Sequence, residues 1–301
     1  MAINSLKKYD IKNLTTFKIG GLIDEVYFPD NTEAFKLILE QNSGIKVFGN
    51  LSNTLISSDG YRGKIILTKE MDSVVIDGTK VIADCGVKGP KLAQEVCKFG
   101  LSGLEFMIGF PGSVGGEIFM NASAHGQCIS DRLVSVICYS RKTNEIIKFS
   151  KDEMEFEYRS SRCERDDLIV LQAKFELELK NSEDIQAQMN ENLNFRRTHQ
   201  PSLVLPNCGS IFKNPPCANP AGKLLESVGA KFLMIGGARV WRNHSNFIIN
   251  TGNATSFDVL NLMLELKERV MEEFGVNLEP ELKFLSSNKE EIKAWQKLIQ
   301  K

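Results

Sequence analysis

Four glycines lie within the eight residues 109–116, and this segment narrows the folds that the chain can adopt. A backbone without side chains can approach a ligand closely, and its successive N–H groups can form a nest for an anion such as a pyrophosphate. The glycine spacing differs from G-x-G-x-x-G, so it does not indicate a Rossmann nucleotide-binding fold. The alternative is an ordinary tight turn between two elements.

Helices and strands alternate irregularly along the chain. We predict a helix over residues 256–274, because apolar side chains recur on one face and Gly275 follows. We predict a strand over residues 168–179, where apolar and charged residues alternate. The other predicted helices cover 32–41 (with Thr32 as its cap), 90–99, 182–197, 222–228 and 290–299, and the other predicted strands cover 45–48, 64–68, 74–76, 81–83, 133–139, 145–149, 247–249 and 276–285.

Composition and charge exclude several classes of protein. Lys and Arg number 37 and Asp and Glu number 38, for a net charge of −1, whereas a nucleic-acid-binding protein normally has a basic excess. No apolar run is long enough to span a membrane, and residues 1–8 lack the apolar core of a secretory signal. We therefore expect a cytoplasmic protein with no nucleic-acid partner and no membrane segment.

The cysteines and histidines do not predict a metal site. The chain has seven cysteines, none in C-x-x-C spacing, and only three histidines. Most of the cysteines lie in apolar runs, where a thiol behaves as a small hydrophobic side chain. This usage is typical of a reducing compartment.

Two polar segments could contact a ligand. Residues 49–53 follow a predicted strand, and Ser52 and Asn53 place short donors there, although an ordinary polar loop has the same composition. Residues 157–162 include Arg159 and Arg162, and an arginine can clamp a carboxylate through two parallel hydrogen bonds. The alternative for these arginines is a surface ion pair.

Two further segments carry groups that could take part in proton transfer. Ser210 follows Gly209, which can present the hydroxyl sharply, and no G-x-S-x-G elbow marks a hydrolase nucleophile. A serine in such a place can deliver a proton if its neighbours tune the hydroxyl. Glu279 and Glu281 are predicted to point away from the apolar side of their strand, and the alternative is that both are solvated.

The order of these motifs resembles the UDP-N-acetylenolpyruvoylglucosamine reductase family of bacterial cell-wall synthesis. The resemblance extends from residue 13 to residue 285, nearly the whole chain. It rests on seven segments, which are TTFKIGG at 15–21, GNLSN at 49–53, the stretch 100–122 with GLSGLE, PGSVGG and NA, YRSSR at 158–162, GSIFKNP at 209–215, AG at 221–222 and LEPE at 278–281.

The resemblance implies an α+β fold with FAD as cofactor. A two-subdomain FAD-binding fold of the vanillyl-alcohol-oxidase (PCMH) type would cover residues 1–70 and 71–195, and a C-terminal α+β substrate domain would cover 196–301. The implied enzyme is a UDP-N-acetylmuramate dehydrogenase: NADPH reduces non-covalently bound FAD, and the flavin N5 hydride then reduces UDP-N-acetylglucosamine enolpyruvate to UDP-N-acetylmuramate. We expect a monomer.

The resemblance also assigns residues to this chemistry. Ser210 matches the serine that protonates the enol intermediate, and Arg159 and Glu281 match the pair that stabilises its charge. A cation aimed at the substrate carboxylate would lower the barrier, because hydride addition drives negative charge there. Contacts to FAD are implied for Gly49, Ser52, Asn53, Pro111, Gly112, Ser113, Gly115, Gly116, Asn121 and Arg162, and contacts to the substrate for Tyr158, His199 and Asn214.

Several positions depart from the family pattern. Leu51 and Ser123 stand where glycine is usual, Glu117 and Trp241 replace small residues, and a lysine is common at His199. A charged Glu117 would repel a nearby pyrophosphate unless it pointed away. Two alternatives are a related flavoprotein oxidase of a sugar or alcohol and a binding protein that has lost turnover. Against the oxidase, residues 49–53 contain no His or Cys of the kind that tethers the flavin in many such oxidases. Against the binding protein, a chain without turnover would have no reason to keep Arg159, Ser210 and Glu281 together.

Overall fold

The computed structural model describes residues 4–202, 204–216 and 219–300, and these divide into two compact units. The predicted division places residues 1–70 in one subdomain, whereas in the structure some of these residues belong to unit 1 and the others to unit 2. Both divisions have a boundary between residues 195 and 196. Unit 1 comprises Asn4, Ser5, Val26–Asn50 and Ile65–Phe195, and unit 2 comprises Leu6–Glu25, Leu51–Lys64 and the described part of Arg196–Lys301.

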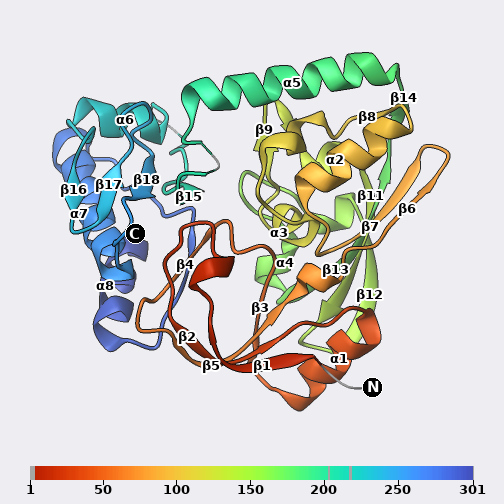
Figure 1. The fold of residues 1–301 in the computed structure, drawn as a ribbon, viewed down its shortest axis with the longest axis horizontal. Coiled ribbons are helices and arrows are strands. Elements are labelled where there is room, and N and C mark those ends of the chain that lie inside the picture. Colours follow the sequence, from red (N-terminus) through yellow and green to blue (C-terminus); the bar gives the residue numbers. More distant parts are fainter. Residues whose placement is uncertain (1–3, 203, 217–218, 301) are drawn as a thin grey trace. The chain divides into compact units, whose positions relative to one another are not determined.

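A five-stranded antiparallel sheet organises unit 1, with the order β12-β11-β13-β7-β6 (Figure 1). Its central strand β13 is predominantly buried, because it has a neighbour on each edge and helices pack against it. The β6–β7 connection is a tight turn, with Gly78 at φ 59°. The strands are β6 (Val74–Asp77), β7 (Lys80–Asp84), β11 (Leu133–Ser140), β12 (Glu145–Ser150) and β13 (Leu168–Glu176).

Strand β13 is shorter than the periodicity predicts. The predicted strand 168–179 breaks after Glu176, and Glu178–Leu179 form a separate strand, β14, that pairs with β8 (Leu101–Ser102). The Leu177 N–H still donates to the Thr79 carbonyl at 2.9 Å, next to the end of β7, and the chain then pairs with β8 from Glu178 onward. The alternation of apolar and charged residues extends to Leu179, but burial ends with Leu177, since Leu179 is 77% exposed.

Two short helices of unit 1 pack against this sheet, and the unit encloses one hydrophobic core. Helices α3 and α4 both contact β13 and each other (Figure 1). Helix α1 begins as predicted, but Asn31 rather than Thr32 caps it, because the Asn31 side chain accepts from the Ala34 N–H at 2.8 Å. The helices are α1 (Thr32–Gln41), α2 (Gly89–Lys98), α3 (Val114–Phe119), α4 (Arg162–Arg165) and α5 (Ser182–His199), of which α5 continues past Phe195 into unit 2. The other short strands are β3 (Lys46–Phe48), β9 (Ser123–Ala124) and β10 (Gln127–Cys128).

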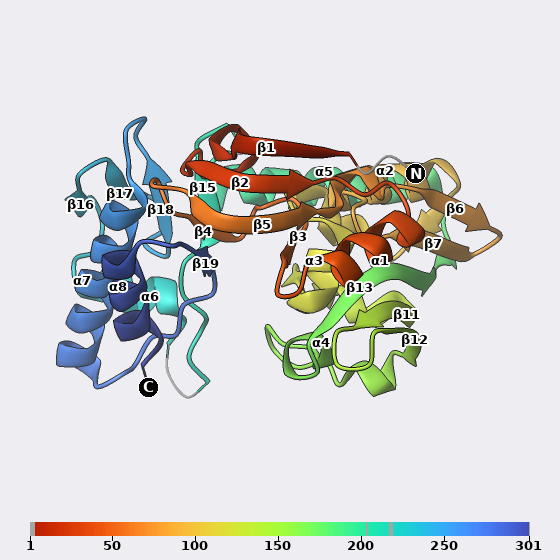
Figure 2. The ribbon, with the colours of Figure 1, turned by 90° about the horizontal axis from the view of Figure 1, so that it is seen from below.

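Unit 2 is built on a four-stranded sheet with the order β15-β18-β17-β16. Helix α7 packs against β16, β17, α6 and α8, as the blue region of Figure 2 shows, and together they bury a second hydrophobic core. A parallel pair, β4 with β19, also belongs to this unit. The elements of unit 2 are β4 (Thr54–Ile56), β15 (Asn207–Ser210), α6 (Ala221–Ser227), β16 (Met234–Ile235), β17 (Ala238–Val240), β18 (Phe247–Asn250), α7 (Ser256–Phe274), β19 (Lys283–Leu285) and α8 (Lys289–Ile299). Three further strands have residues in both units, and these are β1 (Ser5–Asp10), β2 (Leu22–Tyr27) and β5 (Tyr61–Leu67).

Helix α7 confirms its prediction, whereas the strand predicted after it is largely wrong. Gly275 ends the helix in the left-handed conformation, at φ 64°. Of the predicted strand 276–285, only Lys283–Leu285 forms β19. Residues 278–282 form one isolated bridge, between Pro280 and Phe212, and lack the continuous pairing of a strand. The buried side chains of Leu278 and Leu282 produced the alternation.

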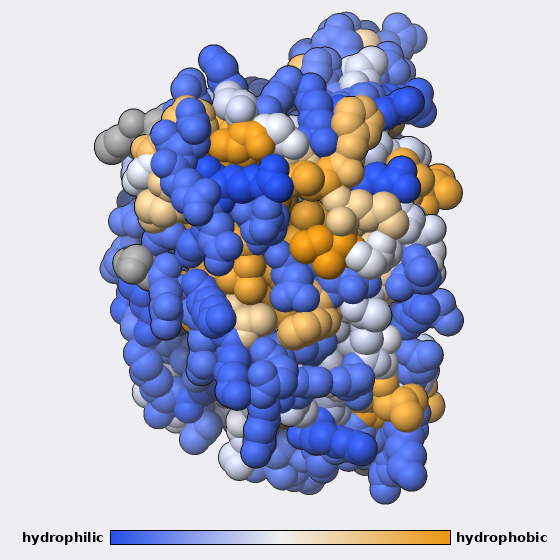
Figure 3. Space-filling model, turned by 90° about the vertical axis from the view of Figure 1, so that its left-hand side faces the viewer, coloured by the Kyte–Doolittle hydropathy of each residue, from blue (hydrophilic) through white to orange (hydrophobic). Residues whose placement is uncertain are grey.

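The outer surface carries apolar side chains in small areas between polar ones, as Figure 3 shows for one face. The exposed apolar residues of unit 2 include Phe232, Phe257 and Met271. No helix in the described part of the chain has the length and apolar character needed to cross a membrane. Within residues 4–202, 204–216 and 219–300, no group of three or more His, Cys, Asp or Glu side chains could hold a metal ion.

Candidate active site

The glycine segment of residues 111–116 is held by backbone hydrogen bonds against the residues that directly follow strand β7 in unit 1. The Val114 N–H donates to the Val87 carbonyl at 2.9 Å, and the Gly115 N–H donates to the Cys85 carbonyl at 2.8 Å. Gly115 must be glycine for this approach, because an added Cβ would lie 2.8 Å from the Cys85 Cβ. Gly116, by contrast, is exposed, and an added Cβ would meet only the Ser113 Oγ at 3.7 Å.

The predicted loop at Gly49 lies directly against this segment. The Asn50 amide donates to the Pro111 carbonyl, and an added Cβ at Gly49 would overlap the Ser113 Oγ. Two motifs separated by about sixty residues of sequence are therefore neighbours in unit 1, as expected for two halves of one binding surface. Asn50 was not among the predicted site residues, and only its place between two predicted contacts could have indicated it.

Two polar atoms beside this surface are buried without a hydrogen-bond partner among the described residues. They are the Ser113 Oγ and the Asn121 Oδ1. Buried polar atoms are nearly always paired, so each such atom calls for an explanation. A polar cofactor that reaches this surface would supply partners for both. The glycine segment and these two atoms fit the pyrophosphate and polar edges of FAD.

Glu117 follows the glycines, and its carboxyl group lies inside unit 1 rather than on the surface. Both carboxylate oxygens are buried without a partner in the described structure. Added Cβ atoms at Gly89 and Gly112 would lie 2.5 and 2.8 Å from Glu117 Oε1, so the carboxyl is packed between two glycine backbones. Burial raises the pKa of Glu117 to about 8. The group is therefore predominantly neutral at pH 7 and does not repel a pyrophosphate, as a charged Glu117 would.

Arg159 lies at the tip of a tight turn in unit 1. Glu157 and Ser160 close the turn with two backbone hydrogen bonds of 3.1 and 3.2 Å. Arg159 has φ 53°, a left-handed conformation that costs free energy for a residue with a side chain and that clusters at functional sites. Its guanidinium lies 5.1 Å from the centre of the Tyr158 ring, and Tyr158 is 52% exposed. The turn thus leaves Tyr158 exposed and Arg159 half-buried.

Asn121 supports this turn, in addition to its predicted contact with FAD. Its amide nitrogen donates to the Glu157 carbonyl at 3.0 Å. Ser161, next to the turn, donates its hydroxyl to the Phe119 carbonyl at 2.9 Å. The segment that leaves α3 therefore holds the segment that carries Arg159.

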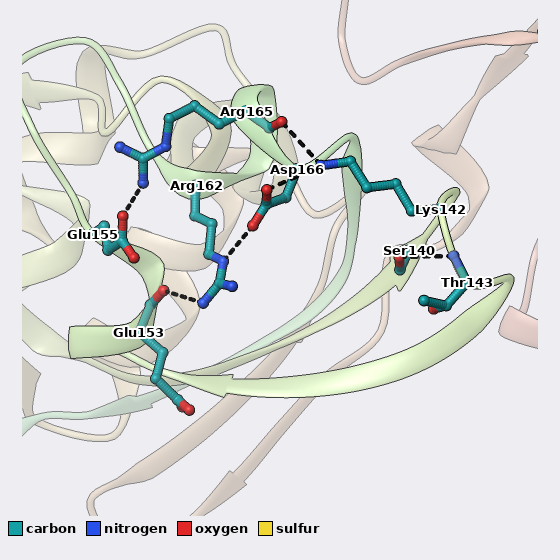
Figure 4. A network of polar contacts seen from close by, with 8 residues as sticks. All are labelled: Ser140, Lys142, Thr143, Glu153, Glu155, Arg162, Arg165 and Asp166. Carbon is teal, nitrogen blue, oxygen red and sulfur yellow. Dashed lines mark hydrogen bonds and ion pairs between the residues drawn. The ribbon is translucent and has the colours of Figure 1, made fainter.

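Arg162 begins α4 and belongs to a network of charged side chains, shown in Figure 4. Its Nε donates to Asp166 Oδ2 at 2.6 Å and its Nη1 to the Glu153 carbonyl at 3.2 Å. The hydrogen bond from Arg162 holds the pKa of Asp166 below its usual value. Lys142 also pairs with Asp166, at 3.1 Å, and Arg165 pairs with Glu155. The predicted contact of Arg162 with the cofactor competes with these bonds and stays a prediction.

Ser210 and Glu281 are brought together in unit 2. Ser210 ends β15 after Gly209, whose φ of 84° turns the chain sharply, as the sequence indicates. The Glu281 N–H donates to the carbonyl of Ile211 at 2.8 Å, and both side chains are half-buried. The Asn53 amide donates to the Glu281 carbonyl at 3.1 Å and joins the predicted loop 51–53 to the same place. The third predicted catalytic residue, Arg159, belongs to unit 1.

The remaining predicted residues lie in unit 2. The side-chain oxygen of Asn214 accepts a hydrogen bond from the Ala221 N–H at 3.0 Å, at the start of α6. Part of the hydrogen-bonding capacity of Asn214 is therefore used within the fold. His199 is exposed at the end of α5, where its Nδ1 lies 2.7 Å from the Thr198 hydroxyl. Ser52 accepts a long hydrogen bond of 3.4 Å from Thr16 at its carbonyl. Leu51 is buried and has φ 52°, so the position favours glycine although leucine fills it.

Comparison with known proteins accounts for the combination of these features. The family model described as the FAD binding domain matches residues 26–150, and the model described as the UDP-N-acetylenolpyruvoylglucosamine reductase C-terminal domain matches residues 200–285. The UDP-N-acetylenolpyruvoylglucosamine reductase of Caldicellulosiruptor saccharolyticus is 40% identical over 289 residues, which cover 94% of this chain and 92% of the relative. The chain belongs to the UDP-N-acetylenolpyruvoylglucosamine reductase family.

Other relatives support the same assignment. The enzyme of that name from Bacillus velezensis is 38% identical over 291 residues, covering 94% of this chain and 95% of the relative. The crystal structure of the Thermus caldophilus reductase superposes with a TM-score of 0.80 and 32% identity, over 95% of this chain and all of that one. The predicted α+β fold, with an FAD-binding part and a C-terminal domain, is confirmed.

Proposed function

We propose that this chain uses NADPH to reduce UDP-N-acetylglucosamine enolpyruvate to UDP-N-acetylmuramate, a step in peptidoglycan synthesis, with non-covalently bound FAD. The observation that carries the proposal is full-length similarity to reductases of this name, with the predicted catalytic residues at structured positions. FAD, when bound, supplies the redox chemistry that no side chain can supply, by accepting a hydride and passing it to the enol ether.

We assign FAD binding to the glycine segment and its neighbours. Gly116 leaves open space for a close approach to the backbone of unit 1, and Ser113 and Asn121 each offer a buried oxygen with no partner among the described residues. Gly49, Gly112 and Gly115 let the chain pack closely on Ser113, Glu117 and Cys85, and we include them in the proposed set. The neutral state of Glu117 removes the electrostatic objection to an anionic group there. Pro111, Ser52, Asn53 and Arg162 complete the proposed set.

We assign the proton and charge chemistry to three residues. The Ser210 hydroxyl donates the proton that completes reduction of the double bond. The Arg159 guanidinium stabilises the negative charge that develops on the substrate carboxylate. Glu281, beside Ser210 through the Ile211 hydrogen bond, orients that carboxylate or shares a proton with it. Tyr158, His199 and Asn214 are proposed to contact the substrate.

We also propose the cellular setting and the finer organisation. The six cysteines in the described part of the chain are free, and five of them are buried, which supports a reducing, cytoplasmic location. The net charge of −1 gives no support for a nucleic-acid partner. We propose a monomer in which residues 1–70 and 71–195 are the FAD-binding subdomains and residues 196–301 form the substrate domain.

Anaerobic absorbance spectroscopy tests the function. NADPH should bleach the flavin of the purified protein, and UDP-N-acetylglucosamine enolpyruvate should then restore the oxidised spectrum. Bleaching without recovery would indicate a different acceptor, and rapid recovery with oxygen alone would favour a flavoprotein oxidase. An absence of flavin after FAD is added would contradict the proposed cofactor.

Replacement of Ser210 tests its role as proton donor. Ser210→Ala should leave reduction by NADPH unchanged and slow reoxidation by substrate by roughly 100- to 10,000-fold, the usual contribution of a general acid. Ser210→Cys is the matched control, because it keeps a proton donor of similar size and should retain more activity. If Ser210→Ala reoxidises at the wild-type rate, the proton comes from another group.

A further inference from the structure

A direct hydrogen bond links Arg159 to a residue that no motif assigns. Arg159 Nη1 donates to the Ser123 Oγ at 2.8 Å, and both side chains are half-buried. The bond joins two segments of unit 1 that lie 36 residues apart in sequence. The acceptor is a neutral hydroxyl, so this hydrogen bond does not itself offset the charge that the guanidinium would present to a substrate carboxylate. An acidic residue at the same place would form an ion pair and compete with that carboxylate.

Ser123 sits on a small, well-defined hairpin. Strand β9 pairs with β10, with Ser123 opposite Cys128, and the connecting residues His125 and Gly126 have φ 54° and 77°. Two central residues with positive φ are typical of the tight hairpin turn that matches strand twist. The Ile129 N–H closes the base of the hairpin by donating to the Ala122 carbonyl at 3.0 Å. The Ser123 hydroxyl is therefore carried on a backbone whose position is determined locally.

The same stretch of chain also holds the backbone of the Arg159 turn. Asn121 binds the Glu157 carbonyl at 3.0 Å, and Ser161 binds the Phe119 carbonyl at 2.9 Å. Three side-chain hydrogen bonds thus join residues 119–123 to residues 157–161. Two of them secure backbone, and the one from Arg159 to Ser123 secures the guanidinium itself.

We propose that Ser123 is a positioning residue for Arg159, which it holds in a defined orientation before the substrate binds. The proposal rests on the proposed function, in which Arg159 stabilises charge on the substrate. An arginine side chain loses roughly 2 kcal/mol of rotamer entropy when it is immobilised. A partner that restricts the side chain in the free enzyme lowers that cost in the complex and keeps the donors near their productive geometry.

Removal of the hydroxyl tests the proposal through substrate kinetics. Ser123→Ala should slow flavin reoxidation by UDP-N-acetylglucosamine enolpyruvate and raise its KM, with a combined loss of about 10-fold or more in kcat/KM, the size expected for one hydrogen bond from a charged donor. FAD affinity and the rate of reduction by NADPH should not change, because neither involves Arg159. Ser123→Thr keeps the hydroxyl and should restore wild-type reoxidation.

A double-mutant cycle separates positioning from a general structural effect. In an Arg159→Lys background, Ser123→Ala should add no further loss, because the Nη1 donor is already absent. An equal loss in both backgrounds, or wild-type kcat/KM for Ser123→Ala, would overturn the proposal.

Side-chain NMR keeps the proposal testable if the proposed function fails. If substrate does not reoxidise wild-type flavin, the function is wrong, and the guanidinium ¹⁵N relaxation of Arg159 then decides the role of Ser123. Ser123→Ala should increase the mobility of that guanidinium, whose signal is assigned by its loss in Arg159→Lys. Unchanged relaxation would show that Ser123 does not hold Arg159.

Discussion

The carboxyl group of Glu117 shows how far the fold can change the chemistry of a single side chain. An unperturbed glutamate ionises near pH 4.5, but burial raises the pKa of Glu117 to about 8. Desolvation is the cause, since neither oxygen has a hydrogen-bond partner among the described residues. This carboxyl, beside a proposed anion-binding segment, is therefore neutralised by a bound proton and not by an ion pair.

Glu117→Gln should stabilise the protein, increasingly so as the pH rises. Between about pH 4.5 and pH 8 the folded state keeps the proton that the unfolded state loses, so unfolding becomes easier with rising pH. Glutamine removes this dependence. The gap in Tm between variant and wild type should be smallest near pH 4.5, grow with pH and level off above pH 8. Thermal unfolding of the FAD-free protein measures it, and a gap independent of pH would show that Glu117 is ionised in the fold.

Within helix α3, two adjacent glycines have different physical reasons to be small. Gly115 faces the sheet, where its N–H bonds to the Cys85 carbonyl and a Cβ would press on Cys85. Gly116 is exposed and has open space, so the packing of unit 1 does not require glycine there. A bound cofactor that approaches the backbone closely would explain the second glycine.

Alanine at each position should separate these two reasons. Gly115→Ala should destabilise the FAD-free protein by about 1–3 kcal/mol, because overpacking against a strand cannot be relieved by rotating a side chain. Gly116→Ala is the matched control and should keep the Tm of the FAD-free protein, but it should weaken FAD binding by about tenfold or more. Thermal unfolding and flavin fluorescence titration measure the two effects. Wild-type FAD affinity in Gly116→Ala would place the cofactor away from this glycine.

At the scale of the whole molecule, each unit has its own hydrophobic core. The core of unit 1 includes Leu171 and Phe175 of β13, and the core of unit 2 includes Leu266 of α7, all buried. A separate core is what allows a part of a chain to fold and open as a cooperative unit. The family models match residues 26–150 and 200–285 separately, although the first range includes residues 51–64 of unit 2.

Leu266→Ala should loosen unit 2 selectively. Truncation of a fully buried leucine costs about 2–5 kcal/mol, because it removes apolar contacts and leaves a cavity. Native-state hydrogen exchange should therefore show lost protection in α7 and the β16–β18 sheet, with β11 and β13 unaffected. Leu171→Ala is the matched substitution in unit 1 and should give the reverse pattern. Equal loss of protection throughout would show that both cores unfold as one.

Local patterns determined much of what the sequence could predict. The limits of α7 follow from its apolar period and Gly275, and the sharp presentation of Ser210 follows from Gly209, because both depend on residues within a few positions of each other. The order of the motifs along the chain was enough to indicate the family and the FAD cofactor. These properties need no knowledge of which distant segments meet.

Only the tertiary structure decided the properties that depend on distant neighbours. The chain from 276 to 282 alternates like a strand but pairs only in part, because its partners lie near residues 211–213. From the sequence alone Glu117 would be expected to be charged, and its burial between Gly89 and Gly112 makes it neutral. Ser123 reads as a departure from the family pattern, and the fold makes it the acceptor for Arg159. Burial and long-range hydrogen bonds arise from the packed chain, and no local pattern of residues encodes them.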